Sequence, residues 1–369
     1  MNRSESLFLE LLSSAIWDVP PAATFFTSID EKTWKEVFRY ASMHSVDALM
    51  ASSVRRLPKE SQPPSKLRIG AYLQMENIED ANRKLNRQLI EISEIYRSLD
   101  LKFLLLKGQG NALYYPDPLH RSPGDIDLFL YREGDYEKAK QWIKDMNYEM
   151  EVESPHHQGY NIGDTHIENH RLITYFVRKK YDRLLQQEVD EIIGQQSFDL
   201  VEIEGKAIQV LPTELNAFFI FQHMFRHFIY TGTGMRQLCD WLLFLKAHKT
   251  SIRKEKLLKL AEKFDLLRPM RIFAQLAVTY LNAPPDIFPF ELGKPSRYPR
   301  LLMEDILNGG QFGFYRLKGQ PKTLWRGRWH RYKLTVKRSF LFGAIAPSHV
   351  YPLPFHKLIH RVKLTLKGS

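Results

Sequence analysis

KGQGNALYYPDPLHRSPGDIDLFL, residues 107–130, is the stretch that decides how this chain folds. Near its end, Asp125 and Asp127 alternate with apolar residues in the run DIDLFL, residues 125–130. Side chains along a strand alternate between its two faces, so both carboxylates share one face and the apolar residues point to the core. Two carboxylates on one face repel each other unless a cation lies between them. Mg²⁺ is the usual ion, because carboxylates, waters and substrate phosphates hold it.

The residues before this strand predict a turn that approaches a ligand. The apolar run LKFLLL, residues 101–106, predicts a buried strand that ends at Lys107 and Gly108. Gly108 and Gly110 let the backbone come close to a bound group, and the next residues could start a helix whose first amides face a phosphate. Strand, glycine turn, short helix and acidic strand together predict a cradle for nucleotide phosphates and a metal. An ordinary edge strand with solvated acids is the alternative.

The segments KG, residues 107–108, and HRSPGDIDLFL, residues 120–130, resemble the DNA polymerase beta-like nucleotidyltransferase superfamily, whose signature is a glycine-containing turn followed by an acid-x-acid strand. More closely, the chain resembles the bacterial uncharacterised nucleotidyltransferase family, in which Lys-Gly, Arg-x-x-Gly-Asp-x-Asp-Leu and a later Glu-x-His segment recur. The resemblance covers most of the chain. One departure is Gln109, which follows Gly108 where the superfamily commonly has Gly or Ser.

The resemblance implies an enzyme, a nucleotidyltransferase that moves a nucleoside monophosphate from an NTP to an acceptor hydroxyl and releases pyrophosphate. It implies Mg²⁺ or Mn²⁺ as the cofactor and leaves the acceptor open. The fold that we expect is α+β, with a small mixed sheet of the polymerase beta type between N- and C-terminal helical regions. We expect an N-terminal helical region at 1–100, the nucleotidyltransferase core at 101–205, a C-terminal helical region at 206–305 and a basic extension at 306–369.

A third carboxylate is expected on a hairpin that follows the acidic strand. The Gly-Asp pair at 163–164 predicts a turn between two extended runs, and on the second run His166, Glu168 and His170 share one face. Beside the two aspartates, Glu168 would complete a two-metal site for phosphoryl transfer. The family resemblance has an acid two residues before a histidine at this point, which maps onto Glu168 and His170, and we expect His170 to line the cleft.

A segment before the hairpin offers alternatives for the third acid. Helical spacing predicts a helix at 135–145, and alternation predicts a strand at 148–153. Glu151 and Glu153 on that strand are the alternatives to Glu168.

The expected chemistry gives each charged group a role. An ion held by Asp125, Asp127 and Glu168 would neutralise the triphosphate and lower the pKa of the acceptor hydroxyl, which then attacks the α-phosphorus in line. We expect the two aspartates to bridge both metals and Glu168 to hold the metal that activates the acceptor. Lys107 and Arg121 would place positive charge near the phosphates, although a surface salt bridge is the alternative for Arg121.

From residue 211 the chain is expected to be helical again. The apolar run at 215–230 has His223 and His227 four residues apart, hence on one helical face. A zinc site needs a third ligand and the zincin motif needs a Glu, and neither is evident, so we expect structural or cleft-lining histidines.

The next helix begins after two glycines and contains Arg236 and Asp240, which are one turn apart. The family pattern has a similar Arg and Asp here, which implies that the pair lines the nucleotide or acceptor side; an ion pair that stabilises the helix is the alternative. Cys239 has no activating base at a suitable spacing, so it is not a candidate nucleophile. The residues expected to bind nucleotide or phosphate are Lys107, Gly108, Arg121, Gly124, Arg236 and Asp240.

Composition limits the class of protein. The chain has 369 residues, which suggests two or three domains, and one cysteine, which excludes an internal disulfide and a Cys-rich zinc site. No apolar run approaches the roughly 20 residues of a membrane span, and the first residues do not form a signal peptide. We therefore expect a cytoplasmic protein.

Positive charge is concentrated at the C-terminal end. Residues 306–369 contain thirteen Lys or Arg and no acidic residue, so the rest of a chain with net charge +11 carries about −2. Such a segment attracts polyanions, namely tRNA, an acidic glycan or an anionic membrane surface. The interleaved aromatic residues suit stacking on bases or packing against the parent domain, and a solvated tail is a further alternative. These aromatic and histidine residues are Trp325, Trp329, His330, Tyr332 and Phe340.

A second function from another class stays open. The chain is either an enzyme or a protein on a degenerate nucleotidyltransferase fold that binds a nucleotide or a partner without chemistry. Gln109 in the glycine turn favours the second, whereas the intact pair Asp125 and Asp127 favours the first, because clustered carboxylates are costly to keep.

Overall fold

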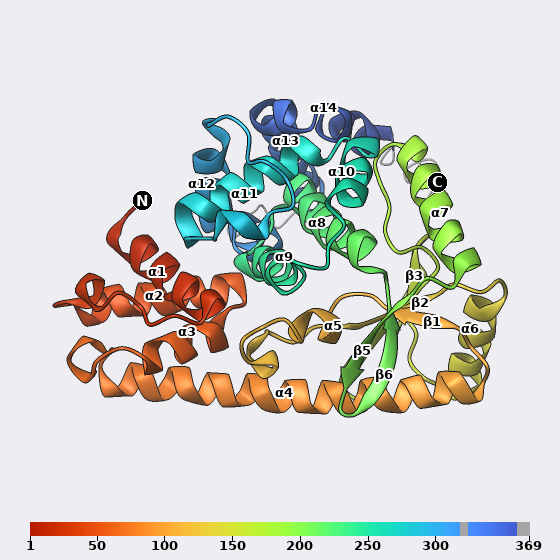
Figure 1. Ribbon diagram of the computed structural model, residues 1–369, viewed down its shortest axis with the longest axis horizontal. Coiled ribbons are helices and arrows are strands. Elements are labelled where there is room, and N and C mark those ends of the chain that lie inside the picture. The colour runs from red at the N-terminus through yellow and green to blue at the C-terminus, as the bar shows by residue number, and fades with distance from the viewer. Residues whose placement is uncertain (318–323, 360–369) are drawn as a thin grey trace.

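A six-stranded mixed sheet lies among helices in the computed structural model, which describes residues 1–317 and 324–359 (Figure 1). The strands run in the spatial order β3-β4-β2-β1-β6-β5. β1 pairs antiparallel with β2 and parallel with β6, β2 pairs parallel with β4, and β3–β4 and β5–β6 are antiparallel hairpins. The predicted α+β fold is thus confirmed. The strands are β1 (Phe103–Leu105), β2 (Ile126–Leu130), β3 (His157–Ile162), β4 (Thr165–His170), β5 (Asp199–Ile203) and β6 (Lys206–Val210).

The alternation along β2 gives the sheet two different faces. Ile126 and Leu128 are buried in a core with the long helix α4 (Ser65–Ser98) and with α6 (Asp135–Asp145). Phe129 points to the other face and joins the core built from the helices of both ends of the chain. Asp127 is two residues from Phe129 and therefore lies on that second face. Ile126, Leu128 and Leu130 thus lie on the face opposite Asp127, as predicted, and Phe129 shares the face of Asp127.

Helices from both ends of the chain share one hydrophobic core. Ser13 and Trp17 of α1 (Arg3–Trp17) donate hydrogen bonds to the carbonyl of Leu281, at the end of α11 (Leu267–Leu281). The same core includes residues of α8 (Thr213–Tyr230) and α9 (Met235–Ala247). Helical regions that are separate in the sequence are therefore joined in space. The other helices are α2 (Glu31–His44), α3 (Asp47–Arg55), α5 (Gln109–Ala112), α7 (Lys179–Gln195), α10 (Lys254–Lys263), α12 (Tyr298–Gly309), α13 (Leu324–Phe342) and α14 (Pro347–Val350).

The long helix α4 and the C-terminal helices lie on opposite sides of the sheet. Figure 1 shows α4 along the bottom of the view, beneath the strands, with α8 and α9 above them. Within residues 1–317 and 324–359, every helix is too short or too polar to cross a membrane.

Two segments differ from what the sequence predicted. The strand expected at 148–153 is wrong: the segment makes one isolated bridge, Met150 to Tyr160, and Val152 is 97% exposed. The β5–β6 hairpin was not predicted. Its turn at Glu204 and Gly205 falls where the nucleotidyltransferase core was expected to end, and the sheet continues beyond that point to Val210.

Part of the positive charge of the C-terminal segment is internal. Arg316 and Arg338 both pair with Asp305, and Arg338 also donates to the carbonyl of Phe228 in α8. Trp329 and Phe340 on α13 are instead 47% and 82% exposed. The two arginines thus help to hold the segment, together with buried apolar residues such as Phe342, while Trp329 and Phe340 remain on the surface. The side chain of Trp325 and residues 318–323 and 360–369 lie outside the described part of the chain.

The buried His44 predicts acid sensitivity of the fold. Its ring is fully buried, stacks on Phe8 at 5.5 Å, and has its pKa lowered from 6.5 to about 3 by burial. Below pH 6.5 the imidazole of His44 binds a proton in the unfolded chain but not in the folded chain. The contribution of neutral His44 to the free energy of unfolding is therefore complete above pH 6.5 and is lost as the pH falls toward 3. We expect wild type to lose about 2–3 kcal/mol relative to His44→Leu between pH 7.5 and pH 4.5.

Urea unfolding at several pH values measures this difference. Met43→Leu, a buried substitution in the same helix that removes no titratable group, should follow the wild-type pH dependence. Parallel curves for wild type and His44→Leu would contradict the prediction.

Candidate functional site

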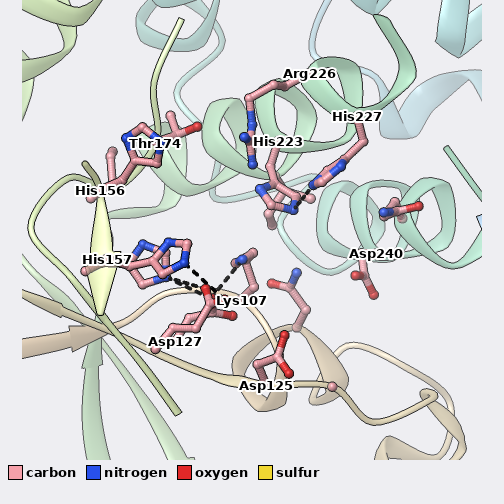
Figure 2. Close-up of a pocket in the computed structure, with 18 of the residues that line it drawn as sticks. Lys107, Asp125, Asp127, His156, His157, Thr174, His223, Arg226, His227 and Asp240 are labelled. Atoms are coloured by element: carbon pink, nitrogen blue, oxygen red, sulfur yellow. Dashed lines mark hydrogen bonds and ion pairs between the residues drawn. The ribbon is translucent and has the colours of Figure 1, made fainter. Parts of the chain in front are cut away.

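Three carboxylates line one cavity at the ends of β2 and β4. In the parallel pairing of these strands, Asp127 lies opposite Glu168 and Phe129 lies opposite His170. Asp125 directly precedes β2. Asp125, Asp127 and Glu168 all face a cavity of about 280 Å³ (Figure 2). The structure thus brings together the three acids that the sequence nominated.

Asp127 is the centre of the hydrogen-bonding in this cavity. Its Oδ1 is 2.9 Å from Lys107 Nζ and 2.9 Å from His170 Nε2, and the same His170 atom is 3.1 Å from Glu168 Oε2. Burial alone would raise the pKa of Asp127, but Lys107 and His170 outweigh burial and hold that pKa well below its usual value. Burial would lower the pKa of His170, and its two carboxylate partners raise it instead.

Asp125 has no comparable partner. Burial raises its pKa first, and the negative charges of Asp127 and Glu168 raise it further. Repulsion by the two neighbouring acids therefore adds to the effect of burial on Asp125. A cation between them would remove that repulsion.

The glycine turn fixes the end of β1 against β2. Gly108 has φ of +56°, and a Cβ at this position would lie 3.1 Å from the carbonyl oxygen of Asp125. Both the positive φ and the close approach require glycine. The next residue, Gln109, is buried and donates to Asn86 Oδ1 of α4, so its side chain points away from the cavity. Lys107 and Gly108 line the cavity, whereas Gln109 is not part of its wall.

The loop that leads into β2 is held by α9. Arg121 is buried and binds Asp240 through two hydrogen bonds, Nε to Oδ1 and Nη2 to Oδ2, both of 2.9 Å. Tyr115 donates to Asp240 Oδ1 at 2.7 Å. Arg236 donates to the carbonyls of Ser122 and Pro123, both at 3.2 Å.

The structure contradicts one of the two interpretations of Arg236 and Asp240. Asp240 pairs with Arg121 and not with Arg236, so the ion pair within the helix, which was the alternative interpretation, does not form. Arg121, Gly124, Arg236 and Asp240 do line the cavity. The positive charge of Arg121 is already matched by Asp240, whereas Arg236 donates its hydrogen bonds to the carbonyl oxygens of Ser122 and Pro123.

Helix α8 supplies the opposite wall of the cavity. His223 and His227 line it, and their Nε2 atoms are 3.1 Å apart. Burial, followed by nearby positive charges, lowers the pKa of both rings well below the usual value, so both are neutral. They are cleft-lining histidines, as expected.

Sequence reasoning missed a stack of side chains on this wall. Arg226 lies over the ring of Tyr175 at 4.4 Å, and His156 stacks on the same ring with centroids 3.8 Å apart. All three line the cavity. An arginine inside the apolar run at 215–230 was the available signal, because arginine is rarely buried without a partner.

Positive and negative side chains line the cavity in equal numbers, but only some of the positive ones are paired with a carboxylate. Lys107 and Arg121 are each bonded to a carboxylate. In the described part of the chain, neither Arg226 nor Arg236 forms an ion pair with a carboxylate. The charged lining residues are Lys107, Arg121, Arg226, Arg236, Asp125, Asp127, Glu168 and Asp240.

The donor set fits a divalent cation. Carboxylate oxygens are the ligands that Mg²⁺ and Mn²⁺ prefer, and three of them meet at this cavity. The alternative acids lie elsewhere: Glu153 pairs with Lys140 and accepts from Tyr136, and neither Glu151 nor Glu153 is part of the cavity wall.

Comparisons with known proteins agree with the resemblance seen in the sequence. The model of a family described as "Uncharacterised nucleotidyltransferase" matches residues 30–282. The crystal structure of an antigenic nucleotidyltransferase-like protein from Paracoccidioides brasiliensis matches at 15% identity and a TM-score of 0.32, covering 55% of this chain and 96% of that chain. No curated protein matches the chain.

The buried pair Arg121–Asp240 predicts a large loss of stability when one partner is neutralised. Asp240→Asn would leave the guanidinium buried without a counter-charge, and we expect the free energy of unfolding to fall by about 3–5 kcal/mol. The midpoint of chemical unfolding measures the loss. Glu304→Gln is the control, because the pair Arg300–Glu304 is 79% and 49% exposed and should contribute less than about 1 kcal/mol. A loss of similar size in both variants would contradict this account of the pair.

Proposed function

The chain belongs to the uncharacterised nucleotidyltransferase family, and we propose that it transfers a nucleoside monophosphate from an NTP to an acceptor hydroxyl, with release of pyrophosphate. One observation carries the proposal. Three carboxylates line a cavity whose wall also holds two arginines, Arg226 and Arg236, without carboxylate partners among the described residues. A metal–triphosphate complex has the matching distribution of charge, because its cation suits the acids and its phosphates suit the arginines.

The carboxylate side would hold the metal. Asp125, Asp127 and Glu168 offer oxygen ligands from two adjacent strands. A divalent ion such as Mg²⁺ or Mn²⁺ supplies, when bound, neutralisation of the triphosphate and a lower pKa for the acceptor hydroxyl. Lys107 already bonds to Asp127 and would keep one positive charge at this side whether or not an ion is present.

The helical side would hold the phosphates. Arg226 is kept in place by the ring of Tyr175, and Arg236 by the carbonyls of Ser122 and Pro123. Both guanidinium groups thus have fixed positions before a ligand binds. Preorganised charge of this kind stabilises the charge that develops in a phosphoryl transfer without reorganisation cost.

The proposed reaction uses these positions. The acceptor oxygen attacks the α-phosphorus, the bond from that phosphorus to the oxygen that bridges to the β-phosphate breaks, and pyrophosphate leaves with the electron pair. The hydroxyl proton passes to a carboxylate of the cavity. Arg226 and Arg236 would stabilise the charge on the leaving pyrophosphate, and the acids would orient the attacking oxygen.

The acceptor would approach from the mouth of the cavity and is left open between a nucleic acid such as tRNA and a sugar or other small molecule. On α13, Lys333 and Lys337 are exposed, and so are Trp329 and Phe340. This surface would suit a polyanionic acceptor.

A second candidate function is nucleotide binding without transfer. It is favoured by Gln109, which stands where the superfamily commonly has Gly or Ser. The side chain of Gln109 bonds to α4, so this position offers the phosphates neither a serine hydroxyl nor the open backbone of a glycine. The two functions differ in one measurable property. A binding protein would hold an NTP without releasing pyrophosphate in either wild type or variant.

Loss of one acid should abolish transfer. We expect Asp127→Asn to reduce transfer of α-labelled NMP by at least about 100-fold, because it removes a central carboxylate of the charged cluster. The assay uses each α-labelled NTP with Mg²⁺ or Mn²⁺, with and without total tRNA and a cell extract, and follows label into RNA, protein or small molecules. Glu202→Gln, an exposed acid on β5 outside the cavity, is the matched control and should keep full activity. Undiminished transfer in Asp127→Asn would refute the assignment of the site, and NTP binding without any transfer would favour the binding protein.

Loss of one arginine should weaken nucleotide binding. Charge-assisted hydrogen bonds contribute about 1.5–3 kcal/mol, so Arg226→Ala should raise the Kd for an NTP by roughly 10- to 100-fold. Arg297→Ala is the matched control, because Arg297 lies over Tyr298 at 5.7 Å but outside the cavity. Isothermal titration calorimetry measures both. Equal Kd values for wild type and Arg226→Ala would contradict the placement of the phosphates.

A further inference from the structure

The imidazole rings of two histidines lie next to the same carboxylates. His157 of β3 and His170 of β4 are paired neighbours in the hairpin, and their rings lie 5.1 Å apart. One ligand atom each from His157, Glu168 and His170 lie within 4.8 Å of one another. The sequence assigned His170 only to the cleft wall and assigned nothing to His157. Figure 2 shows His157 beside Asp127, across the cavity from His223.

The distances between these atoms are those of ligands around one metal ion. Metal–ligand bonds of about 2.0–2.2 Å place adjacent ligand atoms roughly 3.0–3.4 Å apart in octahedral or tetrahedral geometry. His170 Nε2 is 2.9 Å from Asp127 Oδ1 and 3.1 Å from Glu168 Oε2, and His157 Nε2 is 3.6 Å from Glu168 Oε1. The strands hold these side chains at nearly the right spacing, so an ion could bind with only small movements of the rings.

The kind of donor selects the kind of ion. Mg²⁺ takes oxygen ligands almost exclusively, whereas imidazole nitrogen suits Mn²⁺, Fe²⁺, Co²⁺ and Zn²⁺. Two imidazoles with one carboxylate, and the carboxylate of Asp127 next to them, therefore disfavour Mg²⁺ at this position. His166 is near Glu168 as well, at 3.8 Å, but its Nδ1 contacts Asn161 Oδ1 and it is not in the group of three.

We propose that His157, Glu168 and His170 form a binding site for a divalent transition metal, with Asp127 as a neighbouring fourth ligand. The site deepens the proposed function, because it shares Asp127 and Glu168 with the carboxylate cluster and rests on that function for its catalytic use. Binding of the ion itself requires no nucleotide. Asp125 is not one of the proposed ligands, so its carboxylate remains free to bind a second ion next to the substrate.

Cobalt binding tests the proposal directly. The full chain, stripped of metal by a chelator, is titrated with CoCl₂ and separately with MgCl₂, by calorimetry and by visible absorption of Co²⁺. We expect Co²⁺ to bind at least about 100-fold more tightly than Mg²⁺, because imidazole nitrogen donors prefer Co²⁺ to Mg²⁺. His157→Ala and His170→Ala should each weaken Co²⁺ binding at least about tenfold. His156→Ala is the matched control from the same hairpin and should bind Co²⁺ as wild type does, because its ring stacks on Tyr175 instead.

The outcomes separate this site from the proposed reaction. Co²⁺ affinity no higher than that for Mg²⁺, or Co²⁺ affinity unchanged in His157→Ala, would overturn the proposal. If His170→Ala fails to fold, His157→Ala alone decides the test. His170 bonds to two carboxylates, whereas His157 contacts only Glu168 of those two, so its loss should disturb the fold less. Asp125→Asn should bind Co²⁺ normally and yet lose nucleotidyl transfer. Histidine-dependent Co²⁺ binding in a protein that transfers no nucleotide would support this site and reject the proposed function.

Discussion

Carboxylates on neighbouring strands repel one another, and the structure around β2 is arranged to hold three of them together. Lys107 and His170 each contact Asp127 at 2.9 Å, and His170 also reaches Glu168. Gly108 lets the turn that carries Lys107 approach the backbone at Asp125. Only Asp125 is left with a raised pKa. Lys107 and His170 therefore offset part of the negative charge of Asp127 and Glu168, and a bound cation would favour the charged form of Asp125.

The positions of these acids depend on packing far from the cavity. β2 is fixed from one side by the apolar contact with α4 and α6, and from the other by the core that joins the helices of both ends of the chain. The buried pair Arg121–Asp240 connects the loop before β2 to α9. Through these contacts the strand that carries the acids and the helices that carry Arg226 and Arg236 are kept at a fixed separation. The cavity is thus a property of the whole fold, although the acids come from one hairpin and one strand.

Local pattern predicted β2, the β3–β4 hairpin and the acids of the cavity, but not the β5–β6 hairpin or the partners of the site residues. The alternation in DIDLFL and the turn at 163–164 predicted β2 and the β3–β4 hairpin, because a period of two and a positive-φ glycine are local features. The strand expected at 148–153 failed because alternation does not reveal whether a neighbour is available to bury it. Arg121 binds an acid that is 119 residues away in the sequence, and the stack of His156, Tyr175 and Arg226 joins a strand end, a loop and a helix. Tertiary proximity of this kind leaves no periodic signal.

The arrangement of charge in the cavity argues for a ligand that contains both signs. A triphosphate alone would meet Arg226 and Arg236 favourably but would bring its negative charge toward three carboxylates in a partly desolvated space, where repulsion is stronger than in water. A divalent ion alone would satisfy the acids and leave both arginines without an anion. An ion bound to a triphosphate satisfies both walls at once, and each half of such a ligand reduces the cost of binding the other. Binding of a metal and of a phosphate group would therefore favour each other, because the acids on β2 and β4 and the arginines on α8 and α9 line the same cavity.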